Sequence, residues 1–469
     1  MVTQIATIPL QENRSNVIGT DGQVRRVEPN VHSYWYMLHL LTILGATAIS
    51  LIPQSLIPRH NSIYYPDSWY EIWVVGALFG TFVGRMRSML EFFIFTKENS
   101  IVTINAGLKI FAWSFVPNVC IIFLTQYYWT SLMGLQYPMP LMGLFVFFTG
   151  WLSFICTMRF GVIYPSNLWK NLVFRKTIKT YVMFEAWILV MAFQSDVLAF
   201  GFKAITGSPQ CLFALMIPLA RAMNKKILMK FVAKMVGNND EMANVFHEAR
   251  VNIIYALFVA IRMNGAENLT VVSIILVDIL LQSKLAIDII KMKRQVSTDG
   301  SVRDAMSTRL EKQILKLLMA ELTEGLVPIS YAIGFAMLYY GPNAHLTGNV
   351  LSDLWQYEKV EDVTRLFFIQ GILFGVDLLC VTMNAYLVAN FGNVDLMKQL
   401  CKLLKNYWMV FAILMMDNIF FYFAFHDINL GVDMTLTFEW ITAEGRMKFI
   451  NDSTEIMKDE KESLLSCFN

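Results

Sequence analysis

Acidic side chains lie inside several long apolar segments of the sequence, where ionised groups are uncommon. An ionisable side chain in the core of a membrane costs about 3 kcal/mol on insertion scales, so it normally faces other helices or a water-filled path. A carboxylate in such a place can bind a cation or exchange a proton. The residues concerned are Glu185 and Asp196 in segment 180–202, Asp278 in 269–290, Glu321 and Glu324 in 314–340, Asp377 in 366–391, and Asp417 with its neighbour Asn418 in 406–426.

Asp377 is the strongest single candidate among these acids. Gln370, Asp377 and Asn384 are each seven residues from the next, which places them on one face of one helix. Few lysines or arginines lie in the same segments to pair with the acids, so the set indicates a site or path for a cation or a proton. A second interpretation stays open, in which each acid is an interhelical hydrogen-bonding group that holds the helices together.

Helix-breaking residues accompany two of the acids. Glu321, Glu324 and Pro328 fall on one helical face, and Gly325 lies between them in the sequence. A proline inside a helix frees a backbone carbonyl, which can coordinate an ion where the helix lines a cavity. The sequence therefore predicts that Gly325 and Pro328 interrupt this helix and act as a flexible break beside a site.

Three glycines at four-residue spacing, Gly76, Gly80 and Gly84, lie in an earlier apolar segment. Small residues at this spacing let another helix approach backbone to backbone. We expect this seam to serve helix packing inside the protein.

The elements that carry these residues are predicted to be membrane-spanning helices. Of the 469 residues, 56% are hydrophobic and only 16% charged, and the mean hydropathy is +0.48, whereas a soluble domain has about 25% charged residues. We expect an all-α polytopic transmembrane helix bundle with about nine to eleven membrane helices of about 20 residues each. The clear segments are 34–57, 70–95, 107–128, 139–160, 180–202, 269–290, 314–340, 366–391 and 406–426, and two weaker segments that suit short or re-entrant helices are 210–222 and 245–263.

Basic residues predict how the chain crosses the membrane. Lys and Arg gather in residues 159–179, 221–234 and 291–316, whereas 126–138 contains neither. Basic loops stay on the cytosolic side, so we expect a cytosolic N-terminus. Because nine and eleven spans are both odd, the C-terminus is then expected outside or in a lumen, and the triplets at Asn268 and Asn451 that could accept a glycan fall on the same outer side.

Three parts of the chain follow from this pattern: a polar cytosolic tail over 1–33, a transmembrane bundle over 34–426, and a polar C-terminal tail over 427–469. Within the bundle, residues 223–236 form a basic amphipathic stretch, with Lys226, Lys230 and Lys234 on one stripe. Such a stretch suits a helix in the inner membrane interface, and equally an ordinary cytosolic linker helix.

Several function classes lack their motifs. The sequence contains no GxxxxGK[ST] loop, HExxH helix or GxSxG turn, and its net charge is only +2, so we expect no catalysis, cofactor, metal centre or nucleic-acid partner. The favoured function is a transporter or channel that moves a small solute or cation, ion-coupled through the acids, with the lipid bilayer and that solute or ion as partners. The alternatives are a receptor or ligand-gated channel for a small apolar ligand, and a membrane-embedded lipid transferase. A homo-oligomer stays open.

Overall fold

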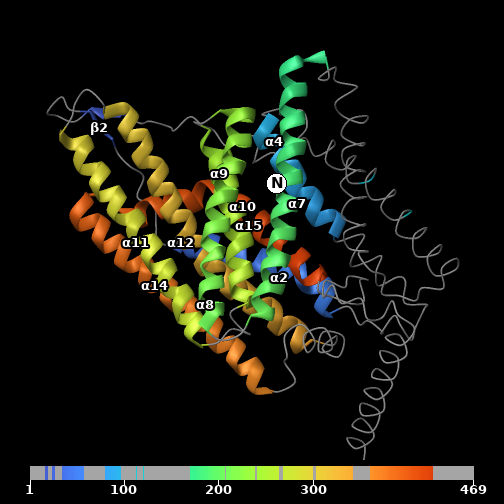
Figure 1. Ribbon diagram of the computed structural model, residues 1–469. Helices are drawn as coiled ribbons and strands as arrows, with labels where there is room; N and C mark the ends of the chain where they lie inside the picture. Colours follow the sequence, from blue (N-terminus) through green and yellow to red (C-terminus); the bar gives the residue numbers. More distant parts are fainter. Residues whose placement is uncertain are drawn as a thin grey trace, which may run out of the picture.

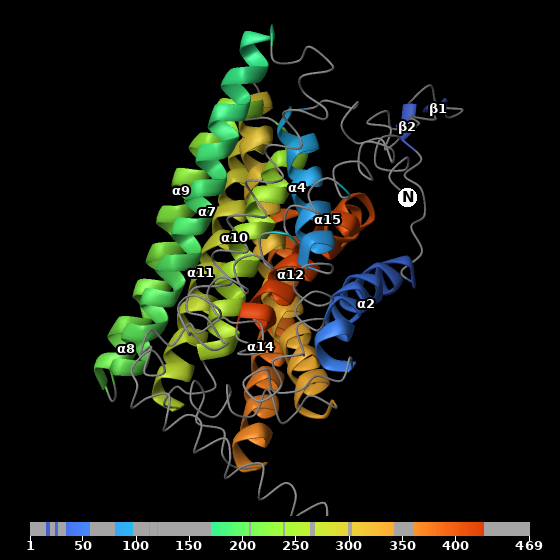
Figure 2. The same cartoon turned by 90° about the vertical axis from the view of Figure 1, so that its right-hand side faces the viewer.

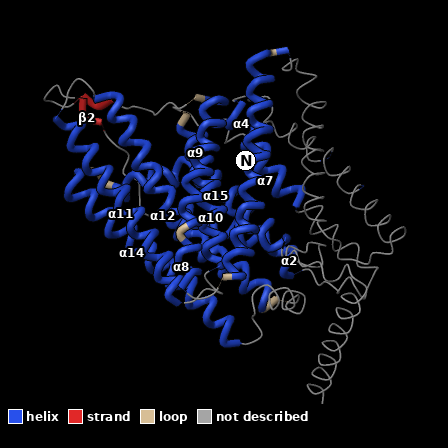
Figure 3. The backbone as a smooth tube through the Cα atoms, viewed as in Figure 1, coloured by secondary structure: helices blue, strands red, loops and turns tan. Residues whose placement is uncertain are grey.

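The computed structural model of the chain is almost entirely helical in the part that it describes (Figure 3). A short hairpin near the N-terminus is the exception: β1 (Asn16–Ile18) and β2 (Val24–Arg26) pair antiparallel. The described residues are 16–18, 24–26, 34–56, 80–96, 112, 120, 170–205, 208–237, 240–262, 268–298, 303–341 and 360–425. The predicted segments 107–128 and 139–160 and the C-terminal tail therefore lie outside the described residues, apart from residues 112 and 120.

The helices pack into a bundle in which α7, α9 and α10 run side by side (Figure 1). Their bounds are α2 (Tyr34–Leu56), α4 (Gly80–Thr96), α7 (Leu172–Ala204), α8 (Ser208–Ala214), α9 (Met216–Val236), α10 (Glu241–Arg262), α11 (Asn268–Thr298), α12 (Arg303–Tyr339), α14 (Val360–Gly392) and α15 (Leu396–Phe425).

Three of the described helices are long and apolar enough to cross a membrane. They cover Asn268–Gln295 in α11, Arg309–Tyr339 in α12 and Val363–Gly392 in α14. Each has at least 28 residues, which at about 1.5 Å per residue exceeds the roughly 30 Å of a hydrocarbon core. These helices fall where the sequence predicts three of its clear segments. Large apolar side chains stay exposed on two of them, including Leu280 on α11 and Leu379 on α14.

Helix α10 lies at the centre of the bundle. It packs against α4, α7, α9, α12 and α15, and almost every residue from Ala243 to Ile261 is buried. The prediction of a short or re-entrant helix over 245–263 is wrong, because α10 is one continuous helix of 22 residues. Its polar first half misled that prediction: His247, Glu248 and Arg250 are buried and have protein partners, so their polarity does not shorten the helix.

The other helices flank α10 on opposite sides. Figure 2 shows α7 and α9 along one side and α2 with α15 on the other, and α2 packs closely on α15. The ring of His39 stacks on that of Trp408, with centroids 5.6 Å apart. Helices α11, α12 and α14 pack on one another. This arrangement brings the acid-bearing helices together.

The region 210–236 forms two helices that meet at Leu215. The second, α9, contains the whole predicted amphipathic stretch. Its buried residues include Asn224, Leu228 and Val232, which recur every four residues, while the lysine stripe is exposed. One face of α9 thus packs against α7 and α10, and its location at a membrane interface stays a prediction.

Candidate functional site

Five of the predicted acids belong to two polar clusters inside the bundle. Asp278, Glu324 and Asp377 line one cavity together with Arg221. We call this cavity the acidic pocket. Glu185 and Asp417 belong to a second cluster, which has arginine partners. The two clusters share none of these residues.

The acidic pocket forms where six helices meet. Its polar side chains come from α9, α11, α12 and α14, and its apolar walls include residues of α8 and α10, among them Cys211 and Tyr255. The free volume is about 50 Å³. Because a buried water needs about 10–15 Å³ of such space, the pocket has room for a few waters or for a small ion with part of its hydration shell.

An ion pair between Arg221 and Glu324 forms one wall of the acidic pocket. A guanidinium nitrogen (Nη2) of Arg221 lies 2.6 Å from Oε1 of Glu324. Arg221 also donates from Nε and Nη2 to Oδ1 of Asn252 on α10, at 3.2 and 3.0 Å. The second oxygen of Glu324 accepts a hydrogen bond from Gln282 at 2.5 Å. Both carboxylate oxygens of Glu324 are therefore occupied by protein donors.

Asp278 and Asp377 are the other two carboxylates of the acidic pocket, and they differ from Glu324 in their pairing. Both side chains are partly exposed, and neither has an ion pair or side-chain hydrogen bond recorded among the described residues. They interact electrostatically with Glu324 and with Arg221. Two carboxylates from two helices therefore face the cavity without a bonded protein donor.

Three further polar side chains lie beside the acidic pocket, on α11, α12 and α14, and we call them the adjacent layer. They are Gln282, Glu321 and Asn384. Asn384 donates to Oε1 of Glu321 at 2.7 Å, and Glu321 interacts electrostatically with Asp377. Because the amide nitrogens of Asn384 and Gln282 face carboxylates, their oxygens point elsewhere. Within the described residues, Oε2 of Glu321, Oδ1 of Asn384 and Oε1 of Gln282 are buried and have no hydrogen-bond partner. All three are acceptors, so this layer complements a donor or a cation.

Pro328 also lines the acidic pocket. The prediction that Gly325 and Pro328 interrupt the helix is wrong, since α12 continues through both residues. Packing explains this continuity, because Leu326 and Val327 beside the proline are buried. Pro328 has no N–H to donate, so the carbonyl of Glu324 lacks its usual helical partner. The role of these two residues as a flexible break stays a prediction.

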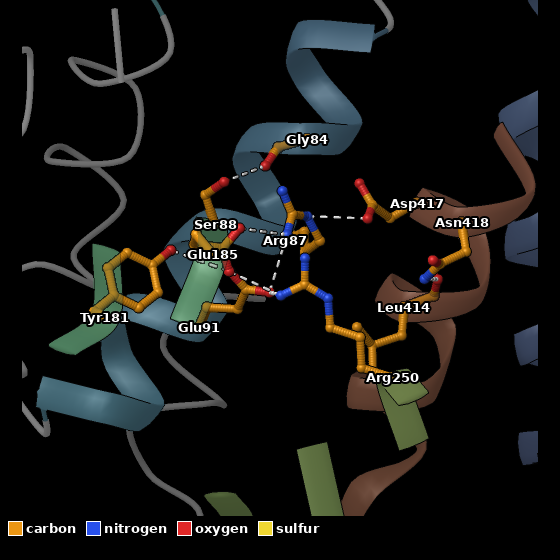
Figure 4. A network of polar contacts seen from close by, with 10 residues as sticks. All are labelled: Gly84, Arg87, Ser88, Glu91, Tyr181, Glu185, Arg250, Leu414, Asp417 and Asn418. Atoms are coloured by element: carbon orange, nitrogen blue, oxygen red, sulfur yellow. Dashed lines mark hydrogen bonds and ion pairs between the residues drawn. The ribbon is translucent and has the colours of Figure 1, made fainter. Parts of the chain in front are cut away.

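The second cluster is a network of ion pairs around Arg87 and Arg250 (Figure 4). Arg87 on α4 lies 3.0 Å from Glu91, 3.3 Å from Glu185 and 3.0 Å from Asp417. Arg250 on α10 pairs with Glu91 and lies 2.8 Å from Glu185. The hydroxyl of Tyr181 donates to Glu91 at 3.1 Å. We call these six residues the ion-pair cluster.

The ion-pair cluster connects four helices, α4, α7, α10 and α15, deep inside the bundle. All six of its side chains are buried, Glu91 completely. Each carboxylate has at least one guanidinium partner, and none of the six residues lines the acidic pocket. Its geometry holds helices together, as the hydrogen-bonding interpretation of the acids predicts.

The remaining predicted residues lie outside both clusters. Gln370 is buried and donates to the carbonyl of Ala260 at 2.8 Å, and Asn418 donates to the carbonyl of Leu414 in its own helix at 2.7 Å. Of the glycine seam, Gly80 and Gly84 lie on α4, where the Gly84 carbonyl accepts from Ser88. The side chain of Asp196 and the whole of Gly76 lie outside the described residues.

Sequence reasoning missed the cationic partners of both clusters. It assigned Arg221 to a basic cytosolic stretch, and it did not connect Arg87 with the acids. Arg87 is 4% exposed and ion-paired. The four-residue spacing of Arg87 and Glu91 is the signal that could have located this pair on one helical face.

In the described part of the chain, no group of three or more His, Cys, Asp or Glu side chains is arranged to hold a metal ion. No protein-family model, curated protein or solved structure matches this chain.

Proposed function

We propose that this protein is a multi-pass membrane transporter or channel that moves a small solute or cation, with the acidic pocket on its path. The observation that carries the proposal is the convergence of Asp278, Glu324 and Asp377, from three different helices, on one cavity. Within the described part of the chain, those three helices are also the ones long and apolar enough to cross a membrane. Ionisable groups that meet at membrane depth beside a cavity are typical of ion and substrate pathways.

In this proposal the chain spans the membrane an odd number of times, about nine to eleven, with its N-terminus in the cytosol. The described helices supply part of that bundle. Tags fused to the two ends test the orientation: a protease added to intact cells should remove a C-terminal tag and leave an N-terminal tag intact.

The test of function is ion movement by the purified full chain in vesicles. Vesicles with the wild-type protein should carry a cation flux, driven by an imposed proton or cation gradient, above that of empty vesicles. Asp377→Asn keeps the side-chain volume and removes the charge that faces the cavity, so we expect the flux to fall about tenfold or more, as for loss of one ion–carboxylate interaction near a protein surface.

A matched control is available on α11. Asp288 is ten residues from Asp278, is partly exposed and does not line the acidic pocket, so Asp288→Asn should retain the flux. Equal fluxes from wild type and Asp377→Asn, or no flux above empty vesicles, would contradict the proposal.

A further inference from the structure

Arg221 is the one cation among the polar side chains that line the acidic pocket. Its guanidinium is fixed from two directions, by Glu324 and by the fully buried Asn252. An arginine bound in this way keeps its charge and its position, since a guanidinium does not lose its proton in proteins.

Glu324 is occupied by this arrangement. Arg221 pairs with one of its oxygens and Gln282 donates to the other, so Glu324 has no oxygen without a donor for an ion in the cavity. Asp278 and Asp377 are then the two carboxylates that the pocket offers, with three unpartnered acceptor oxygens of Glu321, Asn384 and Gln282 in the adjacent layer.

We propose that Arg221 is a specificity-determining residue of this pocket: by holding Glu324 in an ion pair, it leaves two free carboxylates, so that the pocket accepts a small monovalent cation and rejects divalent cations. This inference rests on the proposed function, and it names the class of ion that the path carries. The cavity of about 50 Å³ has room for a small ion with a few waters.

The chemistry of divalent ions supports the second half of the proposal. Ca²⁺ takes about six to eight oxygen ligands, commonly from several carboxylates. The charges of Arg221 and Glu324 cancel within their ion pair, so the pocket attracts an ion through Asp278 and Asp377 alone. Releasing Glu324 from Arg221 would supply a third carboxylate.

The experiment compares Rb⁺ and Ca²⁺ flux in vesicles that contain the full chain. Wild type should carry Rb⁺ and little Ca²⁺. Arg221→Gln should raise the ratio of Ca²⁺ to Rb⁺ flux about tenfold or more, as expected for one additional ion–carboxylate interaction. Lys226→Gln, which removes one exposed charge from the same helix, should leave the ratio unchanged.

A double variant, Arg221→Gln with Glu324→Gln, distinguishes two causes of a changed ratio. One is the release of Glu324 to bind an ion, and the other is a general loss of packing. The double variant leaves no buried carboxylate without its partner, so it should fold where the single variant fails. It again presents two free carboxylates, so the ratio should return toward that of wild type. Arg221→Lys, which retains a charge beside Glu324, should keep the preference for Rb⁺.

The outcomes distinguish this inference from the function on which it rests. If wild type carries Rb⁺ and both Arg221→Gln and the double variant keep its ratio, Arg221 does not set the preference and the inference fails alone. A double variant with the same raised ratio as Arg221→Gln would also overturn it, because Glu324 would then have no part in the effect. If wild type carries neither ion above empty vesicles, the proposed function fails and the inference fails with it.

Discussion

The ion-pair cluster and the acidic pocket are built from the same kinds of side chain but differ in how completely these are paired. In the ion-pair cluster, two arginines reach three carboxylates, and a tyrosine hydroxyl adds a further donor. In the acidic pocket, one arginine reaches one of three carboxylates. None of the residues of the ion-pair cluster lines the acidic pocket, whereas Asp278, Glu324 and Asp377 all do. Pairing within the protein thus distinguishes the groups that hold helices from Asp278 and Asp377, which have no bonded donor among the described residues.

The energetic consequences of this difference follow from desolvation. A buried ion pair contributes little beyond what an apolar pair of the same size would contribute, but removal of one partner leaves the other charge buried and unpaired. Variants of the ion-pair cluster should therefore affect folding first. Substitution of Asp278 or Asp377 leaves no bonded partner unpaired. Such variants should therefore affect ion movement and leave stability nearly unchanged.

The largest effect is expected for Arg250→Met. The change removes one of the two arginines, so Arg87 alone remains for the carboxylates of Glu91, Glu185 and Asp417. The variant should be destabilised by about 3–5 kcal/mol. Denaturant unfolding of the purified protein in detergent measures this loss. Arg175→Met, at an exposed position of α7, is the control and should stay within about 0.5 kcal/mol of wild type. A loss below about 1 kcal/mol for Arg250→Met would mean that Glu91 and Glu185 do not depend on this arginine.

A smaller effect is expected for Tyr181→Phe. The hydroxyl of Tyr181 donates to Glu91, and a hydrogen bond to a charged group contributes about 1.5–3 kcal/mol. The ring packs between Phe92 and Phe95, and phenylalanine preserves that packing. The midpoint of denaturant unfolding should therefore move to a lower denaturant concentration, while the slope of the transition stays constant. An unchanged midpoint would show that Glu91 does not depend on this donor.

The smallest effect on stability is expected for Asp278→Asn. Asp278 has no recorded bond partner in the described residues, so the free energy of unfolding should change by less than about 0.5 kcal/mol. Cation flux should nevertheless fall, as for Asp377→Asn. Unfolding and flux are measured on the same preparation. A variant that loses stability and flux together would place Asp278 among the structural groups and weaken the contrast between the two clusters.

The sequence predicts the acid-bearing helices well but not which acids meet. The seven-residue spacing of Gln370, Asp377 and Asn384 indicates one helical face, yet only Asp377 lines the pocket. Gln370 instead donates to a backbone carbonyl on α10, and Asn384 lies in the adjacent layer. Spacing along one helix fixes the face of a residue, whereas its depth and its neighbours depend on how other helices pack.

The arginines were harder to predict because charge alone has two meanings in a membrane protein. Basic residues gather at the cytosolic ends of helices, and they also neutralise buried acids. Arg250 follows His247 and Glu248 at the start of an apolar run, a pattern that indicated a weak segment. The buried arrangement of α10 depends on Glu91 and Glu185, which lie 159 and 65 residues away in the sequence. No local pattern reports such distant partners.

The contact between His39 on α2 and Trp408 on α15 can form only after α15 has been synthesised. The two residues are about 370 positions apart, and ribosomes add about 5–20 residues per second, so α2 emerges roughly 20–70 s before α15. Through that interval the surface of α2 that packs on α15 has no native partner. A nascent chain that stops before residue 396 never forms this contact between its first and last described helices. The surface of α2 that packs on α15 is therefore accessible to factors that bind unfinished chains for the whole of this interval.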